Sequence, residues 1–214
     1  MEPSRSFSDP KEDFYSSIAE RFDTLTNSYD EQRRVEVLFE ELLPHDLSGK
    51  FLLDDGCGTG IMALQAKKRG ARVVAADISH AQLGQARNKG VPLLVTNNAL
   101  KLPYPDNMFD IVVSSEMIEH TTEPHRAVVE IARVLKPGGI VALTCPNRAW
   151  KWLVDGATAL KVRPFEGYEN FPTFSQLRQF AQEANLRVEK HFGLHPWPFQ
   201  VKPLHNLSRV VDHR

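Results

Sequence analysis

The residues best suited to bind a ligand lie in a glycine-rich segment in the first half of the chain. The segment 53–60 (LDDGCGTG) follows a short apolar run and precedes an Ala/Lys-rich helical pattern over 61–69. Glycines at a strand-to-helix turn let the backbone bend sharply and approach a ligand. Asp77 ends the next apolar run, 23 residues after Asp54, and an acid roughly 20 residues after such a turn usually reaches a ribose. Together these features predict a bound nucleoside, whereas a purely structural turn with solvated acids is the alternative.

The charge of this loop indicates which kind of nucleoside it would hold. A dinucleotide places an anionic pyrophosphate over the turn and favours the spacing G-x-G-x-x-G. Here the spacing is G-x-G-x-G, and Asp54 stands just before it. A carboxylate at that place would repel a pyrophosphate but would suit the ammonium group of an amino-acid moiety. We therefore expect a nucleoside that carries an amino acid rather than a dinucleotide.

His120 is the leading candidate for a catalytic base. It follows the strand predicted at 109–114, and the carboxyl edge of an open parallel sheet faces the ligand crevice. An imidazole titrates near neutral pH and can accept a proton from a hydroxyl or an amine. A structural histidine at the start of a helix is the alternative.

Alternating strands and helices must position these residues. The pattern between residues 13 and 43 predicts two helices, separated at Asn27 and Ser28 and ended by Pro44. Further helices are expected over 61–69, from the cap Ser79 to 88, over 124–135, over 148–161 and over 173–185. Strands are expected at 51–54, 72–76, 91–95, 109–114, 139–145 and 186–192. The alternation predicts an α/β fold: a Rossmann-like, doubly wound, mostly parallel sheet with helices on both faces and a small helical and aromatic cap.

The chain has the size of one domain. We divide this domain into a flexible lead-in (1–11), cap helices (12–44), a cofactor-binding core (50–147) and an acceptor-pocket and C-terminal segment (148–214). The net charge is −1, with 26 basic and 27 acidic side chains, which disfavours a long nucleic acid as partner. Two cysteines and no long apolar run predict a cytoplasmic protein without disulfides or membrane insertion.

Six motifs occur in an order that resembles the class I S-adenosylmethionine-dependent methyltransferases, especially the subgroup that contains the ubiquinone-biosynthesis O-methyltransferases. They extend over nearly half of the chain. These motifs indicate the superfamily, but they do not indicate which acceptor is methylated. The motifs are LDxGxGxG from Leu53, ADIS from Ala76, NAxxLP from Asn98, FD at Phe109, SExxEH from Ser115, and LKPGG from Leu135.

The resemblance implies S-adenosyl-L-methionine as cofactor and S-adenosyl-L-homocysteine as product. It implies that the glycine loop surrounds the methionine part, through Asp54, Gly56, Cys57, Gly58 and Gly60. In the ubiquinone-type enzymes an arginine of the preceding helix often meets the methionine carboxylate, and Arg34 or Arg33 is the nearest candidate; a solvated helix charge is the alternative.

The resemblance also places the nucleoside. Asp77 would hold the ribose and Ile78 would pack on the adenine, while Asn98 and Ala99 would flank the adenine amino group. Ser115 would line the cofactor at the end of the fourth strand.

Two residues depart from the family pattern. Asp55 stands where an apolar residue is usual, and strand alternation turns it away from Asp54 toward a packing face, where it needs a partner or water. Asn98 stands where an aspartate is usual, but its amide oxygen can still accept a hydrogen bond from an amine.

The segment Glu116-Met117-Ile118-Glu119-His120 also resembles the magnesium-binding segment of some ubiquinone-type and small-RNA 2′-O-methyltransferases. Two carboxylates and an imidazole on one helical turn could hold a hard cation such as Mg²⁺. Family members not thought to need a metal share this pattern. We therefore rank structural and cofactor-positioning roles first and expect no metal.

The acceptor is expected to be a small molecule, methylated on a hydroxyl oxygen. N-methylation of a small molecule, methylation of RNA or protein, and a cofactor-binding regulator without turnover are the alternatives. Glu169 and His195 are weaker candidates for the base. Aromatic residues that could line the acceptor pocket are Tyr15, Phe22, Tyr29, Trp150, Trp152, Phe165, Tyr168, Phe171 and Trp197.

Overall fold

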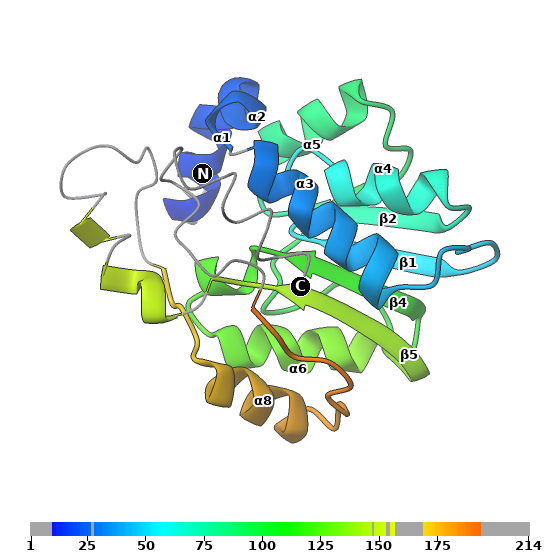
Figure 1. Ribbon diagram of the computed structural model, residues 1–214. Coiled ribbons are helices and arrows are strands. Elements are labelled where there is room, and N and C mark those ends of the chain that lie inside the picture. The colour runs from blue at the N-terminus through cyan, green and yellow to red at the C-terminus, as the bar shows by residue number, and fades with distance from the viewer. Residues whose placement is uncertain (1–9, 27, 147, 153–154, 157–168, 194–214) are drawn as a thin grey trace, which may run out of the picture.

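A five-stranded parallel sheet forms the centre of the protein (Figure 1). The computed structural model describes residues 10–26, 28–146, 148–152, 155–156 and 169–193. The strands are β1 (Phe51–Asp55), β2 (Arg72–Asp77), β3 (Leu94–Thr96), β4 (Phe109–Ser115) and β5 (Leu135–Thr144), in the order β3-β2-β1-β4-β5. The predicted fold class is confirmed.

The strand order reverses between β1 and β4, and ligands bind at such a switch point, outside the carboxyl ends of the strands. Asp54 of β1 is in register with Ala75 of β2 on one side and with Val113 of β4 on the other. Ser115 of β4 is in register with Thr144 of β5. The register therefore brings the last residues of β1, β2 and β4 to one edge of the sheet.

Helices cover both faces of the sheet (Figure 1). One face carries α3 (Ser28–Glu36), its π-helical continuation η2 (Val37–Leu42), α4 (Ile61–Lys68) and α5 (His80–Asn88). The other face carries α6 (Pro124–Val134) and α8 (Phe174–Glu183). No helix among the described residues is long and apolar enough to cross a membrane.

Strand alternation divides the core into two clusters, because successive side chains point to opposite faces. Leu52 and Ile111 belong to the cluster beneath α3 and α4. Leu53 and Val112 belong to the cluster beneath α6. Phe109 of this second cluster is fully buried, with ring contacts to Phe51 at 4.9 Å and Tyr104 at 5.1 Å between centroids.

Several predicted helix starts are confirmed by the caps. The Ser79 hydroxyl accepts a hydrogen bond from the Gln82 N–H at the start of α5. Thr173 caps α8 and forms a reciprocal capping box with Gln176. The 3₁₀ turn η4 (Arg148–Trp150) and helical residues at 151–152 and 155–156 lie within the helix predicted over 148–161, of which the other residues lie outside the described part.

The N-terminal region corrects one prediction. The break between its two predicted helices is confirmed, since Thr26 is extended and α3 begins at Ser28. The first half consists of α1 (Pro10–Ile18), the 3₁₀ turn η1 (Ala19–Arg21) and α2 (Phe22–Leu25). Lys11 was assigned to a flexible lead-in, but it is buried in the first turn of α1.

Three strand predictions were also inaccurate. β3 begins at Leu94 instead of Val91, after Pro92, which has no N–H for a sheet. β5 begins at Leu135, because a register shift beside Phe109 lets the Pro-Gly-Gly segment stay in the strand. No strand occurs over 186–192, where the residues are mostly exposed and carry several charged side chains.

We predict that Phe109→Ala lowers the free energy of unfolding by about 3–5 kcal/mol, because it removes a fully buried ring from the second core cluster. Phe174→Ala is the matched control, since Phe174 is 40% exposed, and it should cost about 1 kcal/mol or less. Urea denaturation measures both values. Equal losses for the two variants would contradict this assignment of the core.

Candidate functional site

The glycine loop lies at the carboxyl end of β1, and its glycines have left-handed backbones. The φ angles are +78° at Gly56, +50° at Gly58 and +86° at Gly60. A Cβ atom at Gly56 would lie 2.2 Å from Cγ of Met117, so a side chain there would displace the segment that follows β4. The predicted need for glycine at this turn therefore has a steric cause, and the loop packs directly against the end of β4.

Asp77 holds the glycine loop from the end of β2. Its Oδ2 accepts a hydrogen bond from the Gly58 N–H at 2.8 Å, and its Oδ1 accepts one from the Ser79 N–H at 2.9 Å. Burial raises the pKa of this carboxyl, although the backbone N–H groups oppose the rise. The structure thus brings Asp77 and the loop together, and the role of Asp77 at a ribose stays a prediction.

Asp54 and Asp55 point to opposite faces of β1, as strand alternation predicted. Asp54 is 1% exposed, and its Oδ2 accepts a hydrogen bond from the Ala63 N–H in the first turn of α4 at 2.8 Å. Burial raises its pKa to about 8. Asp55 is fully buried on the other side, where the Asn97 amide lies 3.5 Å from its Oδ1. Burial raises the pKa of Asp55 to about 7.

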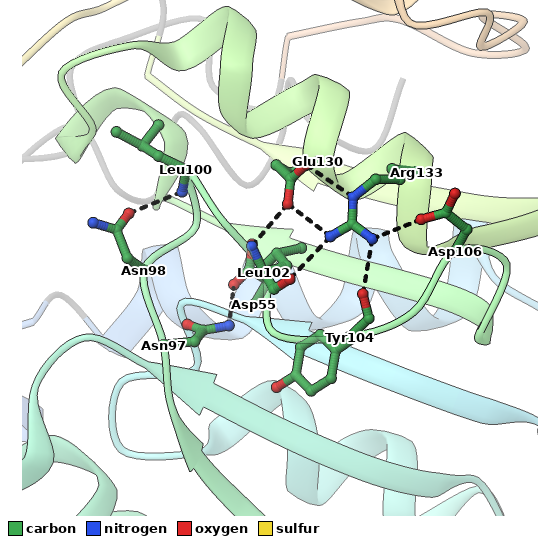
Figure 2. A network of polar contacts seen from close by, with 9 residues as sticks. All are labelled: Asp55, Asn97, Asn98, Leu100, Leu102, Tyr104, Asp106, Glu130 and Arg133. Carbon is green, nitrogen blue, oxygen red and sulfur yellow. Dashed lines mark hydrogen bonds and ion pairs between the residues drawn. The ribbon is translucent and has the colours of Figure 1, made fainter.

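The loop after β3 carries the predicted adenine-side residues and is fastened to α6 (Figure 2). Arg133 of α6 donates to the carbonyls of Leu102 and Tyr104 at 2.9 and 2.8 Å, and Glu130 accepts from the Leu102 N–H at 2.8 Å. Asn98 is exposed, and its Oδ1 accepts from the Leu100 N–H at 2.9 Å. The amide oxygen that was expected to meet adenine therefore already has a backbone partner.

The other two adenine-side candidates, Ile78 and Ala99, are partly buried. Ile78 follows Asp77 directly at the end of β2, and Ala99 packs against the second core cluster. Their placement beside an adenine stays a prediction.

Helices α1 and α2 cover the carboxyl edge of the sheet, where Figure 1 shows them beside α5. The Tyr15 ring of α1 packs edge-on to the His120 ring, with centroids 5.6 Å apart. Ser16 and Ser79 share a hydrogen bond of 3.0 Å between their hydroxyls. The Phe22 ring lies 3.7 Å from the position that a Cβ at Gly58 would take. The cap thus contacts the glycine loop, the start of α5 and the end of β4.

A polar latch, formed by Asp23, Thr59 and Lys89, fastens α2 to the glycine loop. Thr59 donates to Oδ1 of Asp23 at 2.6 Å, and Lys89 Nζ donates to the Thr59 hydroxyl at 2.8 Å. Lys89 also forms an ion pair with Asp23. No sequence pattern indicates this latch, because its members come from three separate elements and show no common spacing.

Arg34 reaches the same edge of the sheet, whereas Arg33 does not. Arg34 forms ion pairs with Asp30 at 3.0 Å and with Glu116 at 3.7 Å. Its Nε is buried and has no hydrogen-bond partner among the described residues. Arg33 instead forms ion pairs with Glu36 of α3 and with Glu41. Of the two arginine candidates, only Arg34 lies beside the end of β4.

His120 lies in the turn η3 (Ile118–His120), and both of its ring nitrogens face protein groups. Nζ of Lys11 is 3.4 Å from Nδ1, and Oε1 of Glu119 is 3.7 Å from Nε2. Glu119 is 1% exposed, and neither of its oxygens has a hydrogen-bond partner in the described part of the chain. Burial and, next, the charge of Glu116 raise the pKa of Glu119 well above its usual range.

The two remaining small residues of the site are Ser115 and Cys57. The Ser115 hydroxyl shares a hydrogen bond of 3.0 Å with Thr144 of β5. Cys57 is buried, and burial together with the nearby aspartates raises the pKa of its thiol. Cys57 is thereby unsuited to act as a nucleophile, because the thiolate is the reactive form of cysteine.

The segment 116–120 does not gather its acids and histidine around one point. Within the described ranges, no group of three or more His, Cys, Asp or Glu side chains could hold a metal ion. The expectation that magnesium is not required stays a prediction.

Of the predicted pocket aromatics, Tyr15 and Phe22 contact the site, Phe171 is buried and Trp152 is exposed. The side chain of Trp150 and the residues Phe165, Tyr168, His195 and Trp197 lie outside the described part.

Comparison with known proteins identifies the family. A methyltransferase-domain family model matches residues 53–143. A ubiquinone biosynthesis O-methyltransferase of Proteus mirabilis is 31% identical over 208 residues, covering 89% of this chain and 84% of the relative. The corresponding protein of Pseudomonas fluorescens is 34% identical, covering 70% and 69%. The chain belongs to the class I S-adenosylmethionine-dependent methyltransferases, in the subgroup of the ubiquinone biosynthesis O-methyltransferases.

The fold of this methyltransferase agrees with that of solved structures. An S-adenosylmethionine-dependent methyltransferase of Mesorhizobium loti superposes with a TM-score of 0.69 at 19% identity, covering 86% of this chain and 95% of that one. At this identity the likeness shows the shared fold alone.

We predict that Thr59→Val speeds dissociation of S-adenosylhomocysteine about three- to tenfold, because it removes the hydroxyl that joins α2 to the loop, at a cost of about 1 kcal/mol. Glu20→Gln, an exposed change in the same N-terminal region, is the control and should leave the rate unchanged. Stopped-flow fluorescence measures both. Unchanged dissociation in the Thr59 variant would show that the latch does not close the site.

Proposed function

We propose that this methyltransferase transfers the methyl group of S-adenosyl-L-methionine to a hydroxyl oxygen of a small molecule. The observation that carries this proposal is the position of His120: it lies beyond the end of β4 and packs against Tyr15 of α1. Relatives named ubiquinone biosynthesis O-methyltransferase support a hydroxyl acceptor. A cap in contact with the loop and a net charge of −1 favour a small acceptor over RNA.

The residues at the carboxyl edge fit the cofactor. Its methionine part would lie along the segment 54–60, with Asp54, Gly56, Cys57, Gly58 and Gly60. The unpartnered Nε of Arg34 could donate to the methionine carboxylate. Asp77 would accept from the ribose hydroxyls, Ile78, Asn98 and Ala99 would border the adenine, and Ser115 would lie near the sulfur. When bound, the cofactor supplies a methyl group that its sulfonium has already activated.

The protein then has to align the acceptor and remove its proton. The Nε2 side of His120 is closed by the buried Glu119, so Nδ1 is the nitrogen that an acceptor would reach. We propose that the acceptor hydroxyl takes the place of Lys11 beside Nδ1 and gives its proton to that nitrogen. The cap made by α1 would exclude water from the reacting atoms.

N-methylation of a small molecule remains the alternative acceptor chemistry, because an amine could occupy the same place beside Nδ1. Turnover with isotopically labelled cofactor and separate panels of phenols, sugars, amines, RNA and peptides distinguishes the candidates. Label in a hydroxyl acceptor is the expected result. Label only in RNA or peptides would contradict the proposal. Cofactor binding without turnover on any panel would favour a regulator. A cytoplasmic location also stays a prediction.

We predict that Asp77→Ala weakens binding of S-adenosylhomocysteine by about 1–3 kcal/mol, the size of lost charged hydrogen bonds. The substitution removes the proposed ribose acceptor and also frees the Gly58 N–H. The control Asp46→Ala removes an exposed carboxylate that likewise accepts from a backbone N–H, at Ser48. Isothermal titration calorimetry measures both, and equal affinity for the Asp77 variant and the wild type would refute the placement.

We predict that His120→Ala lowers turnover about 10²- to 10⁴-fold, the usual contribution of a general base. Cofactor affinity should change less than about threefold, since the ring is proposed to face the acceptor. The control His125→Ala removes a histidine of α6 that pairs with Glu183, and it should keep full turnover. If the His120 variant keeps its rate across the pH range, His120 is not the base.

A further inference from the structure

Asp55 is a buried carboxyl that the proposed reaction does not use. It is the last residue of β1 and the direct neighbour of Gly56, on the face opposite Asp54. It is 0% exposed, and its Oδ2 has no hydrogen-bond partner among the described residues. A buried carboxyl oxygen without a partner costs free energy when it is ionised, so its presence in the core calls for a physical explanation.

The groups that surround Asp55 offer it no positive charge. Asn97 and the Tyr104 hydroxyl face it from the loop after β3, and the Asn97 contact is long, at 3.5 Å. The carboxyls of Glu130 on α6 and of Asp77 on β2 act on it as like charges. Its strand neighbour Asp54 and the Cys57 thiol are the other titratable groups of this edge.

Arg133 is the cation that belongs to this network, but its donors are used elsewhere (Figure 2). It pairs with Glu130 at 2.7 Å and with Asp106 at 2.9 Å, and it donates to two carbonyls of the loop after β3. Among the described residues, no ion pair reaches Asp54, Asp55 or Asp77. A positive charge over the glycine loop would have to come from a ligand.

The two forms of the cofactor differ in that charge. The donor carries a sulfonium, an ammonium and a carboxylate, so its net charge is +1. The product has lost the sulfonium charge and is neutral overall. A cation that arrives beside a buried carboxyl favours the ionised carboxylate, whereas a neutral ligand does not.

We propose that Asp55 is a specificity-determining residue that distinguishes the donor from its product by charge: it holds a proton in the empty site and releases that proton to solvent when the cationic donor binds. After methyl transfer the neutral product favours proton uptake by Asp55, which weakens the attraction and assists product exchange. This inference rests on the proposed placement of the cofactor over the glycine loop. Asp55 acts on the cofactor through the electrostatic field of its carboxylate at the glycine loop, and it does not touch the cofactor.

The number of protons released follows from the thermodynamic linkage between proton binding and donor binding. Burial raises the pKa of Asp55 to about 7, so a fraction of Asp55 is protonated in the empty protein at pH 7, and its ionisation releases up to one proton per donor bound. If donor binding lowers this pKa by one unit, the affinity for the donor will be roughly fivefold higher at pH 8 than at pH 6. Asp54 has a raised pKa as well, so part of the proton release will persist without Asp55.

The test is calorimetric titration of the full chain with donor and with product, at pH 7, in two buffers of different ionisation enthalpy. The difference between buffers gives the number of protons released. We compare the wild type with Asp55→Asn, which keeps the shape of the side chain, and with Asp55→Leu, which fills the site with an apolar group. Asp106→Asn is the matched control, because it changes an exposed carboxylate of the same network.

The expected result is that the wild type and the Asp106 variant release a larger fraction of a proton with the donor than either Asp55 variant does. With the product, all four proteins should release equal numbers of protons. Equal proton release by all four proteins with the donor would overturn the inference while leaving the cofactor assignment intact. Absence of binding by both ligands in all four proteins would instead contradict the proposed function.

Discussion

Three carboxyl groups lie at the carboxyl ends of two neighbouring strands, and among the described residues none of them has a basic partner; this is the constraint on which the site depends. Asp54, Asp55 and Asp77 all have raised pKa values because burial disfavours their charged forms. Backbone N–H groups stabilise Asp54 and Asp77, but Asp55 has only a distant amide. Such an edge offers no positive charge to a phosphate, whereas a bound cation favours the ionised carboxylates, which suits a sulfonium cofactor.

The sheet and the cap each contribute to this arrangement. The parallel register brings the ends of β1, β2 and β4 together, so the three acids and His120 share one edge. The helices α1 and α2 then close that edge through Tyr15, Ser16 and the latch at Thr59. Burial of Asp54, Asp55 and Glu119 at this edge strengthens the electrostatic effect of each charge, because the local dielectric constant is low.

The sequence allowed prediction of the parts that depend on local pattern. The glycine spacing, the acid at the end of β2 and the alternation that turns Asp55 away from Asp54 are features of single segments or of adjacent residues. The fold class followed from the alternation of strands and helices. These features need no knowledge of which distant segments touch.

The parts that could not be predicted depend on tertiary contacts. Lys11 was assigned to a flexible segment, since nothing near it in the sequence indicates that it packs beside His120. The burial of Glu119 and the partners of Arg34 also come from remote elements. The strand expected over 186–192 has a β-like pattern, but no described strand pairs with it. A local pattern specifies a strand only when the fold provides a neighbour.

The most direct test of the central claim is to compare a cationic with an anionic nucleoside at the glycine loop. Calorimetric titration at pH 7 with S-adenosylmethionine and, separately, with a nicotinamide dinucleotide makes this comparison. We expect saturable heat with S-adenosylmethionine and none with the dinucleotide at millimolar concentration. Binding of the dinucleotide with similar affinity, or no heat with S-adenosylmethionine, would contradict it.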